Sequence, residues 1–199
     1  SKDRVSVYLD GKFAFGLALI HALWLRVGQA LSDSEIDDLK AADTLEKAKQ
    51  RAIGLISYRP RSVEEVKRRL KRVGVDDGAI EGVIASLRES GLLDDQSFSK
   101  AWVESRLGAS PRSRRMIAWE LRQKGVSEAT ISDSIENVDD EAAGLALATK
   151  HWPRFAKLET INERRRKMSE FLARHGFDYE TIRDIITKLE NKYGNNMGD

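Results

Sequence analysis

Apolar residues recur along most of this chain at the three- and four-residue steps that place them on one face of a helix. Val66 and Leu70 form one such pair, and Ile80 and Ile84 form the next. Gly74 lies between the two pairs, and glycine readily adopts the left-handed conformation that ends a helix. The pattern therefore predicts a helix, a tight turn and a second helix.

The same pattern returns twice at a spacing of 51 residues, from Leu70 to Leu121 to Leu172, with a glycine four residues after each leucine. Four further apolar columns keep this period: Val66, Ile117 and Met168; Ile80, Ile131 and Ile182; Ile84, Ile135 and Ile186; and Leu87, Val138 and Leu189. Such a fixed period is the signature of stacked modules. A further helix is expected before each pair, over roughly residues 45–57, 97–107 and 141–152, with Pro153 ending the last one.

We accordingly predict an all-α chain of three tandem three-helix repeats, each resembling a helix-turn-helix unit, in an elongated array. The expected repeats cover residues 45–95, 96–138 and 139–193, and residues 1–44 form an extension outside the period. Because each module of such an array contacts only its neighbours, removal of the third is expected to leave the first two folded.

The extension carries the pattern of a β-hairpin. Apolar residues alternate from Val5 to Leu9 and from Phe13 to Leu17, and Asp10-Gly11 between them is a strong hairpin signal. A lone hairpin is marginal in water, so we expect a helix over residues 18–27 to cover one of its faces. Ser32 and Glu35 then match a capping box that opens the next helix.

Composition narrows the class of protein. The chain has no cysteine, which excludes disulfides and thiolate ligands, and no window approaches the run of roughly 18 apolar residues that a membrane span needs. We therefore expect a cytoplasmic protein without membrane contact. No nucleophile elbow and no phosphate-binding Gly-x-x-x-x-Gly-Lys loop occurs, so we predict no enzyme, cofactor or metal site. Asp94-Asp95 is interpreted as the start of a helix rather than as a metal site.

Charge is distributed unevenly although the net charge is only +2. Residues 47–72 hold ten bases against two acids, and residues 76–95 hold six acids against one base. Residues 112–124 and 127–141 repeat this alternation, and residues 164–174 form a third basic stretch. The second helix of each module is thus expected to be basic and the third helix of the first two modules acidic.

Three blocks of the chain carry distinctive motifs. They are Leu55-Ile56-Ser57-Tyr58-Arg59-Pro60-Arg61-Ser62 with Glu65 and Leu70; Leu87 and Gly91-Leu92-Leu93-Asp94-Asp95 with Phe98, Trp102 and Arg106; and Arg115, Ile117, Glu120-Leu121, Lys124-Gly125-Val126 and Ile131. In these blocks the chain resembles the RecX family of RecA recombination regulators. The resemblance is tight over about residues 45–138 and looser over the last module. It implies a non-enzymatic regulator of DNA repair, recombination and the SOS response. Such a regulator lodges in the RecA filament or caps its end, and suppresses ATPase, strand exchange and co-protease activity.

The expected partners are therefore RecA filaments and single-stranded DNA, with double-stranded DNA as a second option, bound by a monomer without sequence specificity. The candidate contact residues are basic side chains on and beside the second helices, with one tryptophan: Arg59, Arg61, Lys67, Arg68, Lys71, Arg112, Arg114, Arg115, Trp119, Arg122, Lys124, Arg164, Arg165 and Lys167. Trp119 aligns with Arg68 and Glu170, which predicts an exposed position suited to a contact anchor. The alternative for every cation in the set is a solvated helix face.

The middle module is expected to dominate inhibition. Reversing the charges of Arg112, Arg114 and Arg115 is predicted to weaken inhibition while leaving helicity intact. The rival hypothesis is a tandem helix-turn-helix protein that binds DNA directly as a transcriptional or architectural regulator. In that geometry the helix after the turn enters the major groove, yet here it is the acidic one, from Asp76 or Ser127 onward. Binding that depends on RecA rather than on base sequence would distinguish the two hypotheses.

Overall fold

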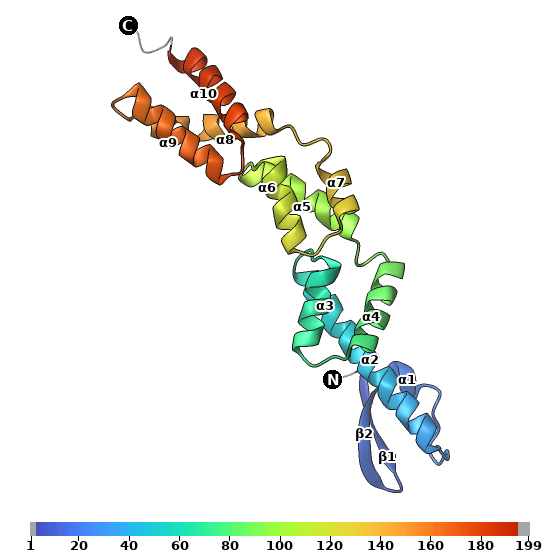
Figure 1. Ribbon diagram of the computed structural model, residues 1–199. Helices are drawn as coiled ribbons and strands as arrows, with labels where there is room; N and C mark the ends of the chain where they lie inside the picture. Colours follow the sequence, from blue (N-terminus) through green and yellow to red (C-terminus); the bar gives the residue numbers. More distant parts are fainter. Residues whose placement is uncertain (1–2, 195–199) are drawn as a thin grey trace. The chain divides into compact units, whose positions relative to one another are not determined.

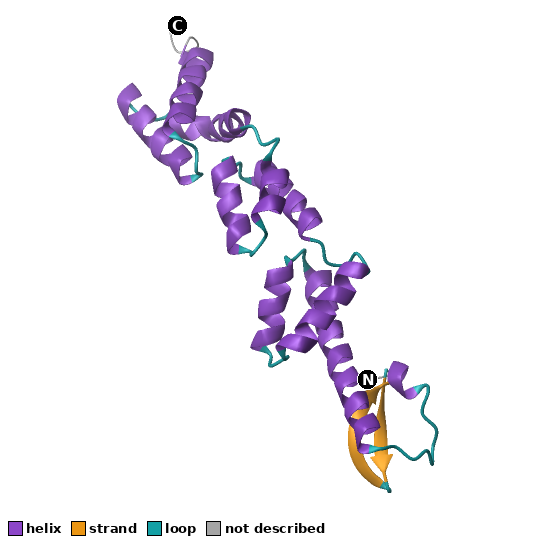
Figure 2. Ribbon diagram, turned by 45° about the vertical axis from the view of Figure 1, so that its right-hand side comes forward, coloured by secondary structure: helices purple, strands orange, loops and turns teal. Residues whose placement is uncertain are grey.

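A computed structural model describes residues 3–194, which form one hairpin and ten helices in two compact units divided between Asp94 and Asp95 (Figures 1 and 2). The first unit holds β1 (Arg4–Leu9), β2 (Lys12–Ala18), α1 (Leu19–Ala22), α2 (Asp33–Tyr58), α3 (Val63–Arg72) and α4 (Asp77–Glu89). The second holds α5 (Asp95–Ala109), α6 (Arg114–Gln123), α7 (Glu128–Ile135), α8 (Asp140–Phe155), α9 (Ile161–Arg174) and α10 (Tyr179–Gly194). Among the described residues, no helix has the length and apolar character needed to cross a bilayer.

The predicted three-helix repeats are confirmed. The first module packs α2, α3 and α4 around one apolar core, the second packs α5, α6 and α7, and the third packs α8, α9 and α10. Leu70, Leu121 and Leu172 of the repeating column are fully buried at the centre of these cores. Each core is therefore built by the same column of the repeat.

The turn glycines act as the sequence predicts. Gly74, Gly125 and Gly176 have φ values of +82°, +77° and +92°, which lie in the left-handed region that side chains resist. The residue after each glycine donates its N–H to the carbonyl of the repeat leucine, at 3.2, 3.2 and 3.4 Å. This bond is the Schellman closure, which satisfies carbonyls that a helix end would otherwise leave unpaired.

The predicted hairpin is present, with its turn at Asp10 and Gly11. Both residues have positive φ, as the two central positions of a type I′ turn require. The strands pair in antiparallel register, with Val5 opposite Leu17, and an irregularity after Val7. Leu17 is fully buried, so one face of the hairpin is covered.

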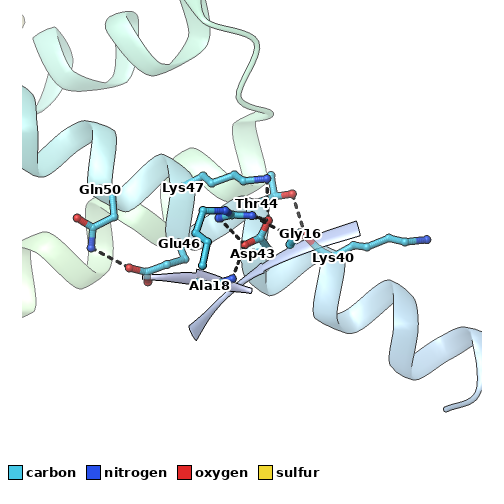
Figure 3. Close-up of polar contacts among 9 residues, drawn as sticks. Gly16, Ala18, Lys40, Asp43, Thr44, Glu46, Lys47 and Gln50 are labelled. Atoms are coloured by element: carbon cyan, nitrogen blue, oxygen red, sulfur yellow. Dashed lines mark hydrogen bonds and ion pairs between the residues drawn. The ribbon is translucent and has the colours of Figure 1, made fainter. Parts of the chain in front are cut away.

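The expected covering helix over residues 18–27 is wrong. The helix α1 is a single turn, and Leu23, Trp24 and Val27 beyond it are exposed. Its N-cap, Ala18, has no side chain able to accept a backbone hydrogen bond, so nothing local offsets the cost of starting a helix. The hairpin packs instead against α2, where Asp43 accepts hydrogen bonds from Arg4 and from the N–H of Ala18 (Figure 3).

Two helices are longer than the sequence suggests. The capping box at Ser32 and Glu35 is confirmed, and the helix it opens continues unbroken to Tyr58. Helix α8 continues through Pro153 to Phe155. A proline in the last turn removes one hydrogen bond, but the N–H of Ala156 still donates to Trp152 at 2.8 Å. Burial of Trp152 and Phe155 in the third core offsets the loss.

Candidate nucleic-acid and protein interface

Four of the predicted contact residues pair with an acidic residue on the third helix of their own module. The pairs are Lys67–Glu81 at 2.5 Å, Lys71–Asp77 at 3.0 Å, Arg122–Glu128 at 2.6 Å and Arg165–Glu190 at 2.7 Å. Hydrogen bonds between Arg122 and Glu128 raise the pKa of the guanidinium and lower the pKa of the carboxyl. Exposed ion pairs stabilise a fold only slightly, so these cations remain accessible to an incoming anion.

Two arginines lie in the turn between α2 and α3. Arg59 forms two parallel hydrogen bonds to Glu65, at 3.0 and 3.2 Å, which raise the pKa of its guanidinium. Arg61 donates its Nε to the carbonyl of Leu55 at 3.0 Å. Both side chains therefore brace the turn as well as adding positive charge to it.

Three arginines of the second unit bind backbone carbonyls. Arg114 donates to the carbonyl of Val138, and Arg115 donates to that of Gly176 at 3.2 Å. Arg164 donates to two carbonyls in the segment between α8 and α9 and lies 5.6 Å from the ring of Trp152. These guanidinium groups connect segments of the fold. They therefore do not form the free basic surface that the sequence alone predicts.

Glu120 organises a charged cluster inside the second module. The residue is only 8% exposed, and its carboxylate accepts from Trp102 Nε1 at 2.8 Å, from Arg106 Nε at 2.6 Å and from Arg112. Lys124 lies 4.1 Å from the ring centre of Trp102, a cation–π distance. Arg112 and Lys124 thus belong to a structural cluster.

Trp119, Arg68 and Lys167 lie at the surface. Trp119 is 55% exposed, which confirms the exposed position that its alignment predicts. Arg115 and Arg122 lie four residues before and three residues after it, so they flank it on the same side of α6. An exposed indole between two guanidinium groups is a typical anchor for a protein contact.

Sequence reasoning missed Arg69 and Arg72. With Arg61, Glu65 and Arg68 they line a hollow of about 170 Å³ on α3. The repeat itself carries the signal that identifies Arg69, because this position corresponds to Glu120 of the second module. A larger hollow of about 740 Å³ lies elsewhere, between the end of β2, α1 and α2.

The described residues thus define a helical repeat protein whose modules share one framework and carry different charged surfaces. Models of RecX domains match all three modules: the first three-helix domain over residues 48–87, the second over 94–135 and the third over 139–186. The chain belongs to the RecX family.

Relatives and solved structures agree with this assignment. The chain is 31% identical to the regulatory protein RecX of Lactobacillus johnsonii over 95% of its own length and 71% of the relative. It is 37% identical to that of Prosthecochloris aestuarii over 72% of its length and 93% of the relative. A crystal structure of a regulatory protein RecX superposes with a TM-score of 0.74, at 26% identity and 93% coverage of both chains. RecX from Lactobacillus salivarius, at 24% identity and covering 75% of this chain and 98% of its own, has a TM-score of 0.66 and shares the fold.

Proposed function

We propose that this chain is a non-enzymatic regulator that binds RecA and its filament on DNA and lowers the ATPase, strand-exchange and co-protease activities of RecA. The observation that carries the proposal is the match of all three modules to RecX domains. The proposal places the chain, as a monomer of the cytoplasm, in DNA repair, recombination and the SOS response.

The surfaces of the modules support a partner that carries both signs of charge. Exposed cations on α3, α6 and α9 suit DNA phosphates, and acids at the start of α4 and α7 suit basic protein surfaces. Trp119 adds an apolar anchor. A filament of protein wound on DNA presents all three kinds of partner group.

The same charges weigh against a sequence-specific helix-turn-helix regulator. The helices that would enter the major groove are α4 and α7, and they begin with Asp77 and Glu128 beside acidic or polar caps. These carboxylates repel phosphates where such a helix must approach them. A preference for one duplex over unrelated duplexes by more than about a hundredfold would favour the rival function.

The test is to add the full chain to RecA filaments already formed on single-stranded DNA and to follow ATP hydrolysis. We expect the wild type to lower the rate, and Trp119→Ala to raise the concentration needed for half-inhibition by about tenfold or more, as loss of an interface anchor does. Tyr179→Ala is the matched control, because Tyr179 is also an exposed aromatic residue, on α10. An unchanged rate of hydrolysis with the wild type would refute the proposed function.

A further inference from the structure

Helices α3 and α6 differ in charge at corresponding positions although the two helices have one framework. At the spacing of 51 residues, Arg69 of α3 corresponds to Glu120 of α6. Arg61 and Arg112 also correspond, each between a proline and the serine that caps the helix. In the second module Arg112 pairs with Glu120. In the first module an arginine takes the place of that glutamate, and Arg61 binds the carbonyl of Leu55 instead.

The first module therefore gathers positive charge that its acidic residues neutralise only in part. Arg68 pairs with Glu64 at 3.4 Å, one turn before it on α3. The module's hollow of about 170 Å³ is lined by four arginines, Arg61, Arg68, Arg69 and Arg72, and by one carboxylate. That carboxylate, Glu65, already accepts both hydrogen bonds of Arg59. Within residues 3–194, no acidic side chain forms an ion pair with Arg61, Arg69 or Arg72. Guanidinium groups in this setting bind phosphate strongly, because their planar donors match its oxygens.

An aromatic side chain stands beside this charge. Tyr58, the last residue of α2, is 85% exposed. It is covalently next to Arg59, which is bonded to Glu65 on the wall of the hollow. Single-stranded nucleic acids are bound by this combination, in which cations follow the backbone and an aromatic ring stacks on a base. An acidic peptide would use the arginines but has no base to stack on the ring.

We propose that the hollow formed by Arg61, Arg68, Arg69 and Arg72 binds backbone phosphate of single-stranded DNA, with Tyr58 stacking on an adjacent base. This inference rests on the proposed function only for its DNA partner. It assigns the main DNA contact to the first module, whereas in the second module the positions that correspond to Arg61 and Arg69 are Arg112 and Glu120, which pair with each other.

The test measures binding of a fluorescent oligothymidylate of about 20 nucleotides to the full chain without RecA. We expect Arg69→Gln/Arg72→Gln to lower affinity about tenfold at low salt. We also expect this variant to reduce the slope of log K against log salt by about 0.7 for each phosphate that it no longer binds. Tyr58→Ala should lower affinity at least about fivefold and leave the slope unchanged, because stacking releases no counterions.

The matched control is Arg51→Gln/Arg88→Gln, which removes two exposed arginines of the same module outside the hollow. We expect its affinity to stay within about twofold of the wild type. Equal losses in the two double variants, or no binding by the wild type, would overturn the inference. Competition by polyglutamate as effective as that by unlabelled oligothymidylate would overturn the assignment to DNA. Because RecA is absent, a chain that binds DNA here but leaves RecA hydrolysis unchanged would refute the proposed function alone.

Discussion

The first and second modules differ in charge at repeat positions that lie outside their apolar cores. Buried serines, Ser62 and Ser113, cap α3 and α6 in the same way. The surface pairs Lys71–Asp77 and Arg122–Glu128 also correspond at 51 residues. The two modules differ at the position of Arg69 and Glu120. Arg69 lines an open hollow, whereas the carboxylate of Glu120 accepts hydrogen bonds from three side chains. The repeat therefore preserves the cap and the surface pair, while the position held by Arg69 and Glu120 has a different role in each second helix.

The first helices of the two modules differ in length for a related reason. Helix α2 has 26 residues and α5 has 15. The additional turns of α2 carry Asp43, whose carboxylate holds Arg4 and the end of β2 (Figure 3). The first module thus extends its framework to support the hairpin.

Exchanging the divergent residues gives the largest expected effect. Glu120→Arg puts a third guanidinium beside Arg106 and Arg112 at a position that is 8% exposed. We expect a loss of about 3–5 kcal/mol of unfolding free energy, as when a buried charge loses its partner. Thermal unfolding followed by circular dichroism should show a melting temperature lower by about 10 °C or more.

The reciprocal exchange, Arg69→Glu, is the control for this experiment. It places a carboxylate at an exposed position near Arg61, and we expect a change within about 0.5 kcal/mol. Equal melting temperatures for the two exchanges would show that the Glu120 cluster does not stabilise the second module, and the contrast between the modules would lose its physical basis.

Substitutions of two turn glycines should distinguish the cost of backbone strain from the cost of a steric overlap. Gly176→Ala forces a side chain into the left-handed region, where its Cβ would lie 2.5 Å from Ser113 Oγ and 2.6 Å from Met116 Cβ. We expect a loss of about 2–4 kcal/mol, from the backbone and the forced overlap together. Gly74→Ala has similar φ but open space around it, so we expect only about 1–2 kcal/mol.

Hydrogen exchange, read separately in each unit, is the measurement that compares these two variants. Protection should fall further in the second unit of Gly176→Ala than in the first unit of Gly74→Ala. Equal losses of protection would mean that the contact between the Gly176 turn and the start of α6 does not contribute to stability.

The sequence predicts those parts of the fold that depend on local signals. The leucine column, the turn glycines, the Asp10-Gly11 hairpin and the Ser32 capping box each act within a few residues, and all are confirmed. The length of α1 is not predicted, because the apolar residues from 18 to 27 favour a helix, whereas Ala18 offers no side-chain cap to offset the cost of starting one. The continuation of α8 through Pro153 is not predicted, because the burial of Trp152 and Phe155 outweighs the hydrogen bond lost at the proline, and burial is not a local signal.

The candidate site was less predictable, because charge is visible in a sequence but its partner is not. The sequence predicts that Arg112, Arg114 and Arg115 form one surface whose charge reversal leaves helicity intact. Their contacts with Glu120 and with two backbone carbonyls, one of them 61 residues away at Gly176, now lead us to expect a loss of stability as well. Any loss of inhibition in that variant must therefore be compared with its melting temperature.

Lowering the pH should weaken the contact between α2 and the hairpin more than it weakens the core of the first module. Burial of Asp43 favours its neutral form, but hydrogen bonds from Arg4, Lys47 and the N–H of Ala18 outweigh this and lower its pKa from 3.8 to about 2. Because the folded pKa is depressed, the stabilisation is complete above pH 3.8 and is lost as the pH falls towards 2. The shift corresponds to about 2 kcal/mol for this 4%-exposed residue.

Hydrogen exchange of the Ala18 amide across this pH range measures the effect. In the wild type, protection of the hairpin should weaken as Asp43 becomes protonated, while the cores of the modules change less. Asp43→Asn should show weak protection at every pH. A variant with wild-type protection at pH 5 would show that the carboxylate does not hold the hairpin.

The smallest effect is expected where the two modules agree. Lys71→Gln and Arg122→Gln each break the equivalent pair between the second and third helices. The side chains of the first pair are 68% and 76% exposed, so water and salt screen the attraction, and the second pair is similarly open. We expect the melting temperatures of both variants to match the wild type within experimental error at 0.15 M salt. A clearly lower melting temperature in either variant would show that the third helix is held by charge rather than by its buried isoleucine, Ile80 in the first module and Ile131 in the second. A loss in only one would show that the shared framework of the two modules does not extend to this pair.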